Sequence, residues 1–193
     1  MYTLFYNARF FTGTGLVDGK ELIVRDNRIE GLADQGSVSA DAHRIDCGGN
    51  LVVAGLIDLQ IAGGGGYLFS SNPAPEALDM IIRSIVSAGT TGFLLALPTN
   101  SREVYRAAFR TVSGCTNPAV MGLHMEGPFI SNARRGAHAP ELIMKPVPEN
   151  VTSLLDESGG TIRMMTVAPE ICTPEVITLL RERSITVAAG HSN

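Results

Sequence analysis

The stretch AVMGLHMEGPFI, residues 119–130, predicts a buried β-strand that carries two polar side chains and ends in a turn. Side chains alternate between the two faces of a strand, so His124 and Glu126 share one face with Val120 and Gly122. The other face is apolar and consists of Met121, Leu123 and Met125. A carboxylate at the end of a buried strand is costly without a partner, and a metal ion is one such partner. The stretch therefore predicts a polar site at a strand end.

Strand-like and helix-like segments alternate on both sides of this stretch. Apolar strands joined by helices indicate a parallel sheet covered by helices, either doubly wound or part of a (β/α) barrel. The predicted strands are 50–63, 90–99, 119–130, 161–170 and 185–193, and the predicted helices are 73–89, 101–112, 148–158 and 173–184.

The polar residues at the strand ends favour the barrel. Gln60, Glu126, Glu170 and His191 follow four different strands, and barrel enzymes collect their functional groups at that end. The GGGG run at 63–66 lacks the spacing of a dinucleotide-binding loop. The predicted fold class is α/β: residues 51–193 form about five strands of a (β/α)8 TIM-like barrel, its first half.

Residues 1–50 have a different pattern. Short strand-like runs are broken by Gly, Asp and Asn, with no segment of helix length. We expect a small antiparallel sheet, or an incomplete part of a β-sandwich, that precedes the barrel segment.

Composition excludes several classes of protein. The chain has 193 residues, of which 45% are hydrophobic and 18% charged, which is typical of a globular protein. A net charge of −4 gives no reason to expect nucleic acid or an anionic membrane as a partner. The three cysteines are far apart, which argues against disulfides and thiolate zinc sites and suits a reducing compartment. With no transmembrane-length apolar run, a cytoplasmic protein is expected.

Glu126 and His191 are the candidate metal ligands. Histidine and carboxylate ligands suit Zn²⁺, Fe²⁺, Co²⁺ or Mn²⁺. The alternative for Glu126 is an ion pair with Arg134 or Arg135, and the alternative for His191 is a structural role at a strand end.

Four further residues are candidates for supporting or binding roles. His124, one layer deeper than Glu126, is expected to support the site as a hydrogen-bonded core histidine. His138 lies in a Gly- and Pro-containing loop and could contact a ligand or simply be solvated. Asp58 and Gln60 end the first barrel strand and could orient a ligand or water, or bind loop backbone instead.

Six segments together carry a resemblance to a known family. They are GLIDLQIAGGGG (55–66), TTGFLLALPT (90–99), GLHMEGPFI (122–130), RRGAHAPE (134–141), TVAPE (166–170) and AAGHSN (188–193). In this order they resemble the N-acetylglucosamine-6-phosphate deacetylase family of the amidohydrolase superfamily, over residues 1 to 193.

The resemblance implies a (β/α)8 barrel with a small β-sandwich built from both chain ends. It implies one divalent metal, with zinc as the first choice, held by Glu126, His191 and a second histidine beyond Asn193. A catalytic aspartate is also expected beyond Asn193, so this chain would hold no catalytic residue of its own. His138 matches a histidine that contacts the substrate sugar, and Gln60 stands where a second metal would need histidine.

The implied reaction is hydrolysis of the acetamide of N-acetylglucosamine 6-phosphate to glucosamine 6-phosphate and acetate. The partner would be a small amino-sugar phosphate, and a homodimer would be compatible with the family. We expect the 193 residues alone to be inactive or nearly so. Ala54, Ala62 and Ala139 depart from the family pattern, and Ala139 bears on substrate specificity.

Two other functions stay open. One is a different amidohydrolase, such as a deacetylase for the galactosamine analogue or a cyclic-amide hydrolase. The other is a non-catalytic fragment or domain that binds a sugar phosphate or a partner protein.

Overall fold

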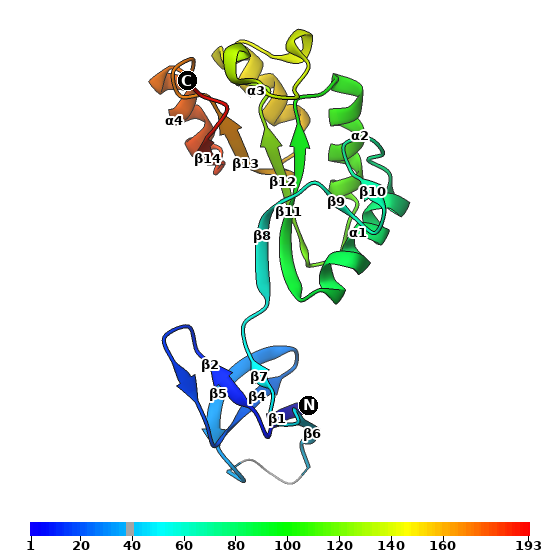
Figure 1. Ribbon diagram of the computed structural model, residues 1–193, viewed down its shortest axis with the longest axis vertical. Helices are drawn as coiled ribbons and strands as arrows, with labels where there is room; N and C mark the ends of the chain where they lie inside the picture. The colour runs from blue at the N-terminus through cyan, green and yellow to red at the C-terminus, as the bar shows by residue number, and fades with distance from the viewer. Residues whose placement is uncertain (38–40) are drawn as a thin grey trace. The chain divides into compact units, whose positions relative to one another are not determined.

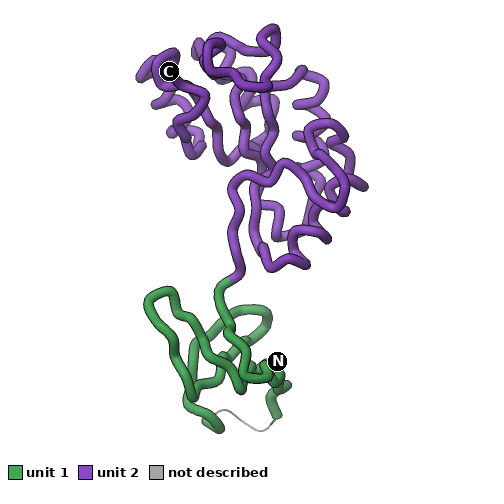
Figure 2. Tube along the Cα trace, viewed as in Figure 1, with its two compact units in different colours: residues 1–54 green, residues 55–193 purple. Residues whose placement is uncertain are grey.

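The computed structural model describes residues 1–37 and 41–193 of the chain. These residues divide into two compact units, residues 1–54 and residues 55–193, coloured separately in Figure 2. The division falls four residues after the predicted boundary, because residues 51 and 52 pair with a strand of the first unit. Within the described ranges, no helix is long and apolar enough to cross a membrane.

The first unit consists of short strands in two sheets. The larger sheet has the order β5-β4-β1-β6 and the smaller one the order β3-β2-β7. The strands are β1 (Tyr2–Tyr6), β2 (Arg9–Phe11), β3 (Leu16–Val17), β4 (Lys20–Arg25), β5 (Arg28–Asp34), β6 (His43–Asp46) and β7 (Leu51–Val52). The expectation of an antiparallel sheet is corrected in part, because β1 pairs in parallel with β6 and β2 with β7.

The second unit is built on a five-stranded parallel sheet with the order β14-β13-β12-β11-β8, a half-barrel (Figure 1). Each strand pairs in parallel with the next one along the chain. The strands are β8 (Leu56–Ile61), β11 (Thr90–Pro98), β12 (Val120–Glu126), β13 (Ile162–Val167) and β14 (Thr186–Ala189). The predicted α/β fold with about five barrel strands is therefore confirmed at this level.

A helix joins each pair of neighbouring strands, as the alternation of segments predicts. The helices are α1 (Pro75–Ser87), α2 (Arg102–Ser113), α3 (Pro148–Glu157) and α4 (Pro174–Glu182). Proline in the first turn begins α1, α3 and α4, where a missing N–H costs nothing. Ser101 caps α2, its side chain accepting a hydrogen bond from the Val104 amide.

The core lies between the helices and one face of the sheet. Alternate residues of β11, namely Phe93, Leu95 and Leu97, are fully buried there. They pack with helix residues such as Tyr105 of α2 and Leu154 of α3. This core fixes where each strand ends, and the strand ends position the candidate site.

The predicted alternation in β12 is wrong at its beginning. The pairing of β12 with β11 shifts register by one residue between Phe93 and Leu94, which leaves Met121 without a partner in the ladder. Met121 is 43% exposed, whereas Val120 packs against the core, so the two residues exchange their predicted faces. From Leu123 onward the predicted alternation holds, with Leu123 and Met125 in the core.

Two loops contain structure that the sequence pattern did not indicate. The glycine run after β8 forms a small hairpin of β9 (Gly63–Gly64) and β10 (Tyr67–Leu68). The long loop after β12 contains two short 3-10 helices, η1 (Asn132–Arg134) and η2 (Pro140–Leu142). This second loop carries His138.

Candidate functional site

Glu126 is the last residue of β12, and its carboxylate meets a side chain from a strand that is not its direct neighbour. Gln60, near the end of β8, donates a hydrogen bond from its side-chain amide to Glu126 Oε1. The alternative of an ion pair with Arg134 or Arg135 is absent from the described ion pairs. The carboxylate is thus held by a neutral side-chain amide and not by an arginine.

His191 lies two residues after β14, and its ring is oriented by backbone from the loop after β12. Its Nδ1 lies 3.1 Å from the carbonyl oxygen of Arg134. A carbonyl only accepts hydrogen bonds, so Nδ1 carries the proton and Nε2 of the neutral ring keeps its lone pair. The Ser131 amide donates to the His191 carbonyl at 3.1 Å, which ties the same loop to this residue a second time.

His138, in the loop between η1 and η2, is buried and contacts Thr99 at the end of β11. Its Nδ1 lies 2.8 Å from Thr99 Oγ1 and 3.3 Å from the Thr99 amide nitrogen. Arg135 donates a hydrogen bond to the His138 carbonyl at 3.0 Å, which steadies the loop. The loop histidine is therefore not a solvated side chain but a fixed one.

The rings of His138 and His191 are in direct contact. Their centroids are 4.6 Å apart and their planes meet edge to face. Burial is the main cause that lowers the pKa of His138, the nearby His191 adds to it, and Glu126 opposes it. His138 is consequently neutral at pH 7, and these three residues form one electrostatic neighbourhood.

His124 has both ring nitrogens engaged within the sheet. Nδ1 lies 2.8 Å from the Leu59 carbonyl of β8, and Nε2 lies 2.7 Å from Thr166 Oγ1 of β13. The neutral ring therefore donates to β8, which lies beyond β11 in the sheet, and accepts from the neighbouring strand β13. It has no lone pair left for a metal, and its geometry is that of a supporting residue that ties three strands together.

Asp58 accepts a hydrogen bond from nearby backbone, and Glu170 accepts from both a side chain and backbone. Asp58 Oδ1 accepts from the Gln60 amide at 2.9 Å, a local turn-like contact beside the residue that holds Glu126. Glu170, beyond the end of β13, accepts from Ser192 Oγ at 2.7 Å and from the Asn193 amide at 2.9 Å. These hydrogen bonds lower the pKa of Glu170 and fix the residues directly after His191.

The donor set fits a divalent metal. Glu126 offers a carboxylate, and His191 offers an unprotonated Nε2, both at carboxyl ends of strands. Among residues 1–37 and 41–193, no three His, Cys, Asp or Glu side chains gather to hold an ion on their own. Glu126 and His191 are thus two candidate ligands, which is fewer than the three protein ligands of a catalytic zinc site.

Two threonines near the site were not indicated by the sequence analysis. Thr99 contacts His138, and Thr166 contacts His124. Both hydroxyls lie in predicted strands, 90–99 and 161–170. The available signal was a threonine at the same end of the sheet as Gln60 and Glu126, but threonine is too common in strands to be singled out.

Comparisons of the sequence with known proteins find relatives that are named as deacetylases of amino-sugar phosphates. No family model matches the chain. An N-acetylgalactosamine-6-phosphate deacetylase from Shewanella sp. (strain ANA-3) is 34% identical over 96% of this chain and 48% of its own length. The human N-acetylglucosamine-6-phosphate deacetylase is 36% identical over 97% of this chain and 48% of its own length. The chain therefore spans about half the length of these curated relatives.

The fold agrees with the same relatives. The crystal structure of N-acetylglucosamine-6-phosphate deacetylase from Pasteurella multocida matches with a TM-score of 0.90 and 31% identity. The match covers 100% of this chain and 52% of that one. The sequence and structure comparisons thus both cover nearly all of this chain and about half of each matched protein.

Proposed function

We infer, from the homology of this chain to the amino-terminal half of the N-acetylglucosamine-6-phosphate deacetylases, that it forms the metal-holding half of such an enzyme. The complete polypeptide would hydrolyse the acetamide of N-acetylglucosamine 6-phosphate to glucosamine 6-phosphate and acetate. In this proposal the half-barrel is completed to a (β/α)8 barrel, and the first unit is part of a β-sandwich.

The observation that carries the proposal is the pairing of Glu126 and His191 with fixed, complementary partners. Gln60 holds the carboxylate, and the Arg134 carbonyl accepts from Nδ1 of His191, which leaves the lone pair of the neutral ring on Nε2. Such outer hydrogen bonds are characteristic of metal ligands, whose orientation and basicity they control.

Glu126 and His191 would hold one divalent metal, with zinc as the first choice and iron, cobalt or manganese as alternatives. When bound, such a metal supplies Lewis-acid chemistry, because it lowers the pKa of water and polarises a carbonyl group. The third protein ligand, a histidine, and the proton-transferring aspartate would come from the second half of the complete polypeptide.

The other residues of the site would bind and orient the substrate. His138, neutral at pH 7, would contact the amino-sugar phosphate with Nε2 of its ring. Gln60 would orient the Glu126 carboxylate and keep one amide oxygen for a substrate group. The location would be the cytoplasm, and a homodimer is compatible with the proposal.

The test measures metal content and turnover of N-acetylglucosamine 6-phosphate with the complete polypeptide that contains this chain. We expect about one metal per chain, as in catalytic zinc sites with a single ion. Glu126→Gln should abolish both metal binding and turnover, because the amide keeps the shape but loses the charge. Glu149→Gln, on the exposed first turn of α3, is the matched control and should change neither.

The same measurements on the complete polypeptide distinguish two alternative functions. A metal-free, inert polypeptide that still binds the sugar phosphate would show a non-catalytic binding protein and overturn the proposal. Turnover of N-acetylgalactosamine 6-phosphate in preference to the glucosamine compound would correct the substrate, a distinction that matters because both kinds of relative match this chain.

A further inference from the structure

The first strand of the half-barrel, β8, contains a β-bulge where it pairs with β11. Between the paired positions Asp58 and Ile61, β8 has two residues where β11 has one. Leu59 and Gln60 therefore lie opposite the single residue Leu94. Bulges are rare between parallel strands, and they occur at barrel rims and beside active sites, where they redirect a side chain.

The bulge turns the Gln60 side chain away from the helices. In a regular strand Gln60 would share the face of Asp58, which is paired with the core residue Phe93. Gln60 instead reaches the carboxylate of Glu126. That carboxylate lies on the opposite face, since the preceding residue Met125 points into the core. One inserted residue thus makes the contact with Glu126 possible.

Two side chains hold the peptide group between Leu59 and Gln60. The Gln60 amide donates a hydrogen bond to Asp58 Oδ1 at 2.9 Å. The Leu59 carbonyl lies 2.8 Å from His124 Nδ1, and because a carbonyl only accepts, the ring donates. The N–H and the C=O of one peptide group are therefore both engaged by side chains. This fixes the plane of the peptide and with it the direction in which the Gln60 side chain leaves the backbone.

His124 reaches this peptide group across β11, which separates β8 from β12 in the sheet. The residue of β11 that is paired with His124 is Ala96, whose side chain is a single methyl group. The ring is buried at 3% exposure, and its Nε2 lies 2.7 Å from Thr166 Oγ1 of β13. The strand that carries Glu126 is therefore tied directly to the bulge that carries Gln60.

We propose that His124 and Asp58 are positioning residues that clamp the peptide group between Leu59 and Gln60 and so aim the Gln60 amide at the Glu126 carboxylate. Neither residue is a metal ligand in this proposal. The clamp itself rests on geometry alone. Its consequence for metal affinity rests on the proposed function, because hydrogen bonds to a ligating carboxylate control its orientation.

The first arm of the test reads the Gln60 amide directly. The chain contains two glutamines, and the other one, Gln35, is exposed in the first unit. Labelling with ¹⁵N-glutamine therefore gives two side-chain amide groups by NMR, and Gln60→Ala assigns them. We expect one Gln60 amide proton downfield of both Gln35 protons, because it is bonded to a carboxylate. Coincident signals in the unmodified chain would overturn the proposal.

The second arm separates the two contacts of His124. His124→Asn places an amide nitrogen near the position of Nδ1, so it keeps a donor for the Leu59 carbonyl and loses the Thr166 contact. His124→Gln places its amide near Nε2 and does the reverse. Each variant loses one buried hydrogen bond, so a merely structural role predicts equal effects. We expect the Gln60 signal to move toward that of Gln35 only in the glutamine variant, and equal signals in the two folded variants would overturn the role of His124.

The third arm tests Asp58 and decides the proposal if a His124 variant does not fold. Asp58→Asn keeps an oxygen that accepts from the Gln60 amide, whereas Asp58→Ala removes it, so only the alanine variant should move the Gln60 signal. Asp46→Ala is the matched control, because Asp46 Oδ1 accepts from the Gly48 amide at 2.8 Å in the same local pattern within the first unit. An unchanged Gln60 signal in Asp58→Ala would overturn the role of Asp58.

The fourth arm uses the complete polypeptide and separates this proposal from the proposed function. His124→Gln should weaken zinc binding about tenfold, as expected for the loss of an outer partner, and His124→Asn should weaken it less. Equal weakening would overturn the consequence for metal affinity. A complete polypeptide that binds no zinc would overturn that consequence together with the proposed function, while the Gln60 signal would still decide whether the clamp positions Gln60.

Discussion

Three histidines at the carboxyl end of the sheet differ in what their ring nitrogens can do, and backbone partners cause the difference. A carbonyl takes the Nδ1 proton of His191, which leaves Nε2 basic. The amide and the hydroxyl of Thr99 both meet Nδ1 of His138, which leaves Nε2 to contact a ligand. His124 uses both nitrogens within the sheet. One residue type therefore supplies a candidate metal ligand, a candidate substrate contact and a structural link.

The structural role of His124 gives a stability prediction. Thr166→Val removes the hydroxyl that pairs with His124 Nε2 and leaves a buried ring nitrogen without a partner, which costs about 1–3 kcal/mol. The free energy of unfolding, measured by urea denaturation, should fall by this amount. Thr186→Val on exposed β14 is the control and should change it by less than about 0.5 kcal/mol. Equal effects of the two substitutions would contradict the structural role of His124.

For single residues, the sequence predicts where the candidate site residues lie along the strands better than it predicts which groups they hydrogen-bond. Glu126 and His191 could be located because each lies at the end of a recognisable strand, and His138 because it matches a family motif. Thr99 and the Arg134 carbonyl could not be anticipated, because their contacts depend on how the 131–146 loop folds back over the strand ends. A loop path is decided by tertiary packing rather than by local periodicity.

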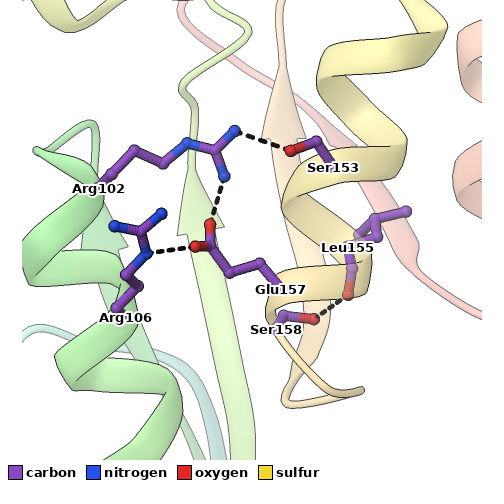
Figure 3. A network of polar contacts seen from close by, with 6 residues as sticks. All are labelled: Arg102, Arg106, Ser153, Leu155, Glu157 and Ser158. Atoms are coloured by element: carbon purple, nitrogen blue, oxygen red, sulfur yellow. Dashed lines mark hydrogen bonds and ion pairs between the residues drawn. The ribbon is translucent and has the colours of Figure 1, made fainter.

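The helices on the outside of the sheet are joined by a charged network between α2 and α3 (Figure 3). Arg102 and Arg106 of α2 both contact the carboxylate of Glu157, and Arg102 also donates to Ser153 Oγ at 3.1 Å. Glu157 is only 22% exposed, so two cations converge on one partly buried carboxylate. The network links the helices that flank β12, the strand of Glu126.

The same network predicts a pH-dependent contribution to stability. Burial alone would raise the pKa of Glu157, but the hydrogen bonds and charges of Arg106 and Arg102 outweigh it, and the pKa lies below its ordinary value of 4.5. A lowered pKa in the folded state stabilises the protein above the ordinary pKa, and this contribution is lost as the pH falls through the folded value.

Glu157→Gln should therefore lower the free energy of unfolding by about 1 kcal/mol at pH 7, a value kept small because the arginines are partly exposed. The difference from wild type should vanish as the pH falls below 4.5. Urea denaturation at several pH values measures both. Asp156→Asn breaks a neighbouring, more exposed ion pair with Arg183 and should cost less at every pH. A cost for Glu157→Gln that persists at acid pH would contradict the electrostatic explanation.

Element by element, the alternation of strands and helices could be predicted because every strand of the half-barrel has an apolar face and every helix an apolar stripe. The bulge at Met121 could not, because a single inserted residue leaves the pattern of apolar residues almost unchanged while it exchanges the faces before it. The β9–β10 hairpin in the glycine run could not be predicted either, because glycine is compatible with many backbone conformations.

At the scale of the whole molecule, the half-barrel leaves apolar side chains of β8 in contact with water. Leu56, Ile57 and Leu59 are 61%, 64% and 47% exposed, and in the described sheet β8 pairs only with β11. Contiguous apolar surface on an edge strand is unusual for a soluble domain. It agrees with the finding that the chain matches about half the length of its relatives.

The proposed function predicts how zinc affinity differs between the chain alone and the complete polypeptide. The 193 residues bring together two candidate ligands, and the proposal places the third in the second half. We expect the chain alone to bind zinc at least about 100-fold more weakly than the complete polypeptide, because a missing ligand costs at least as much as a missing outer partner. We also expect the chain alone to show no turnover.

Competition with a chromogenic chelator measures the affinities, and two matched variants of the complete polypeptide identify the cause. His191→Asn should weaken zinc binding by a similar factor, whereas His43→Asn, an exposed histidine of the first unit, should not. Equal affinity of the chain and the complete polypeptide would mean that the ion is bound without a ligand from the second half. Robust turnover by the chain alone would contradict the proposal that the third ligand and the proton-transferring aspartate come from the second half of the complete polypeptide. The two candidate ligands of this chain would then suffice for the reaction.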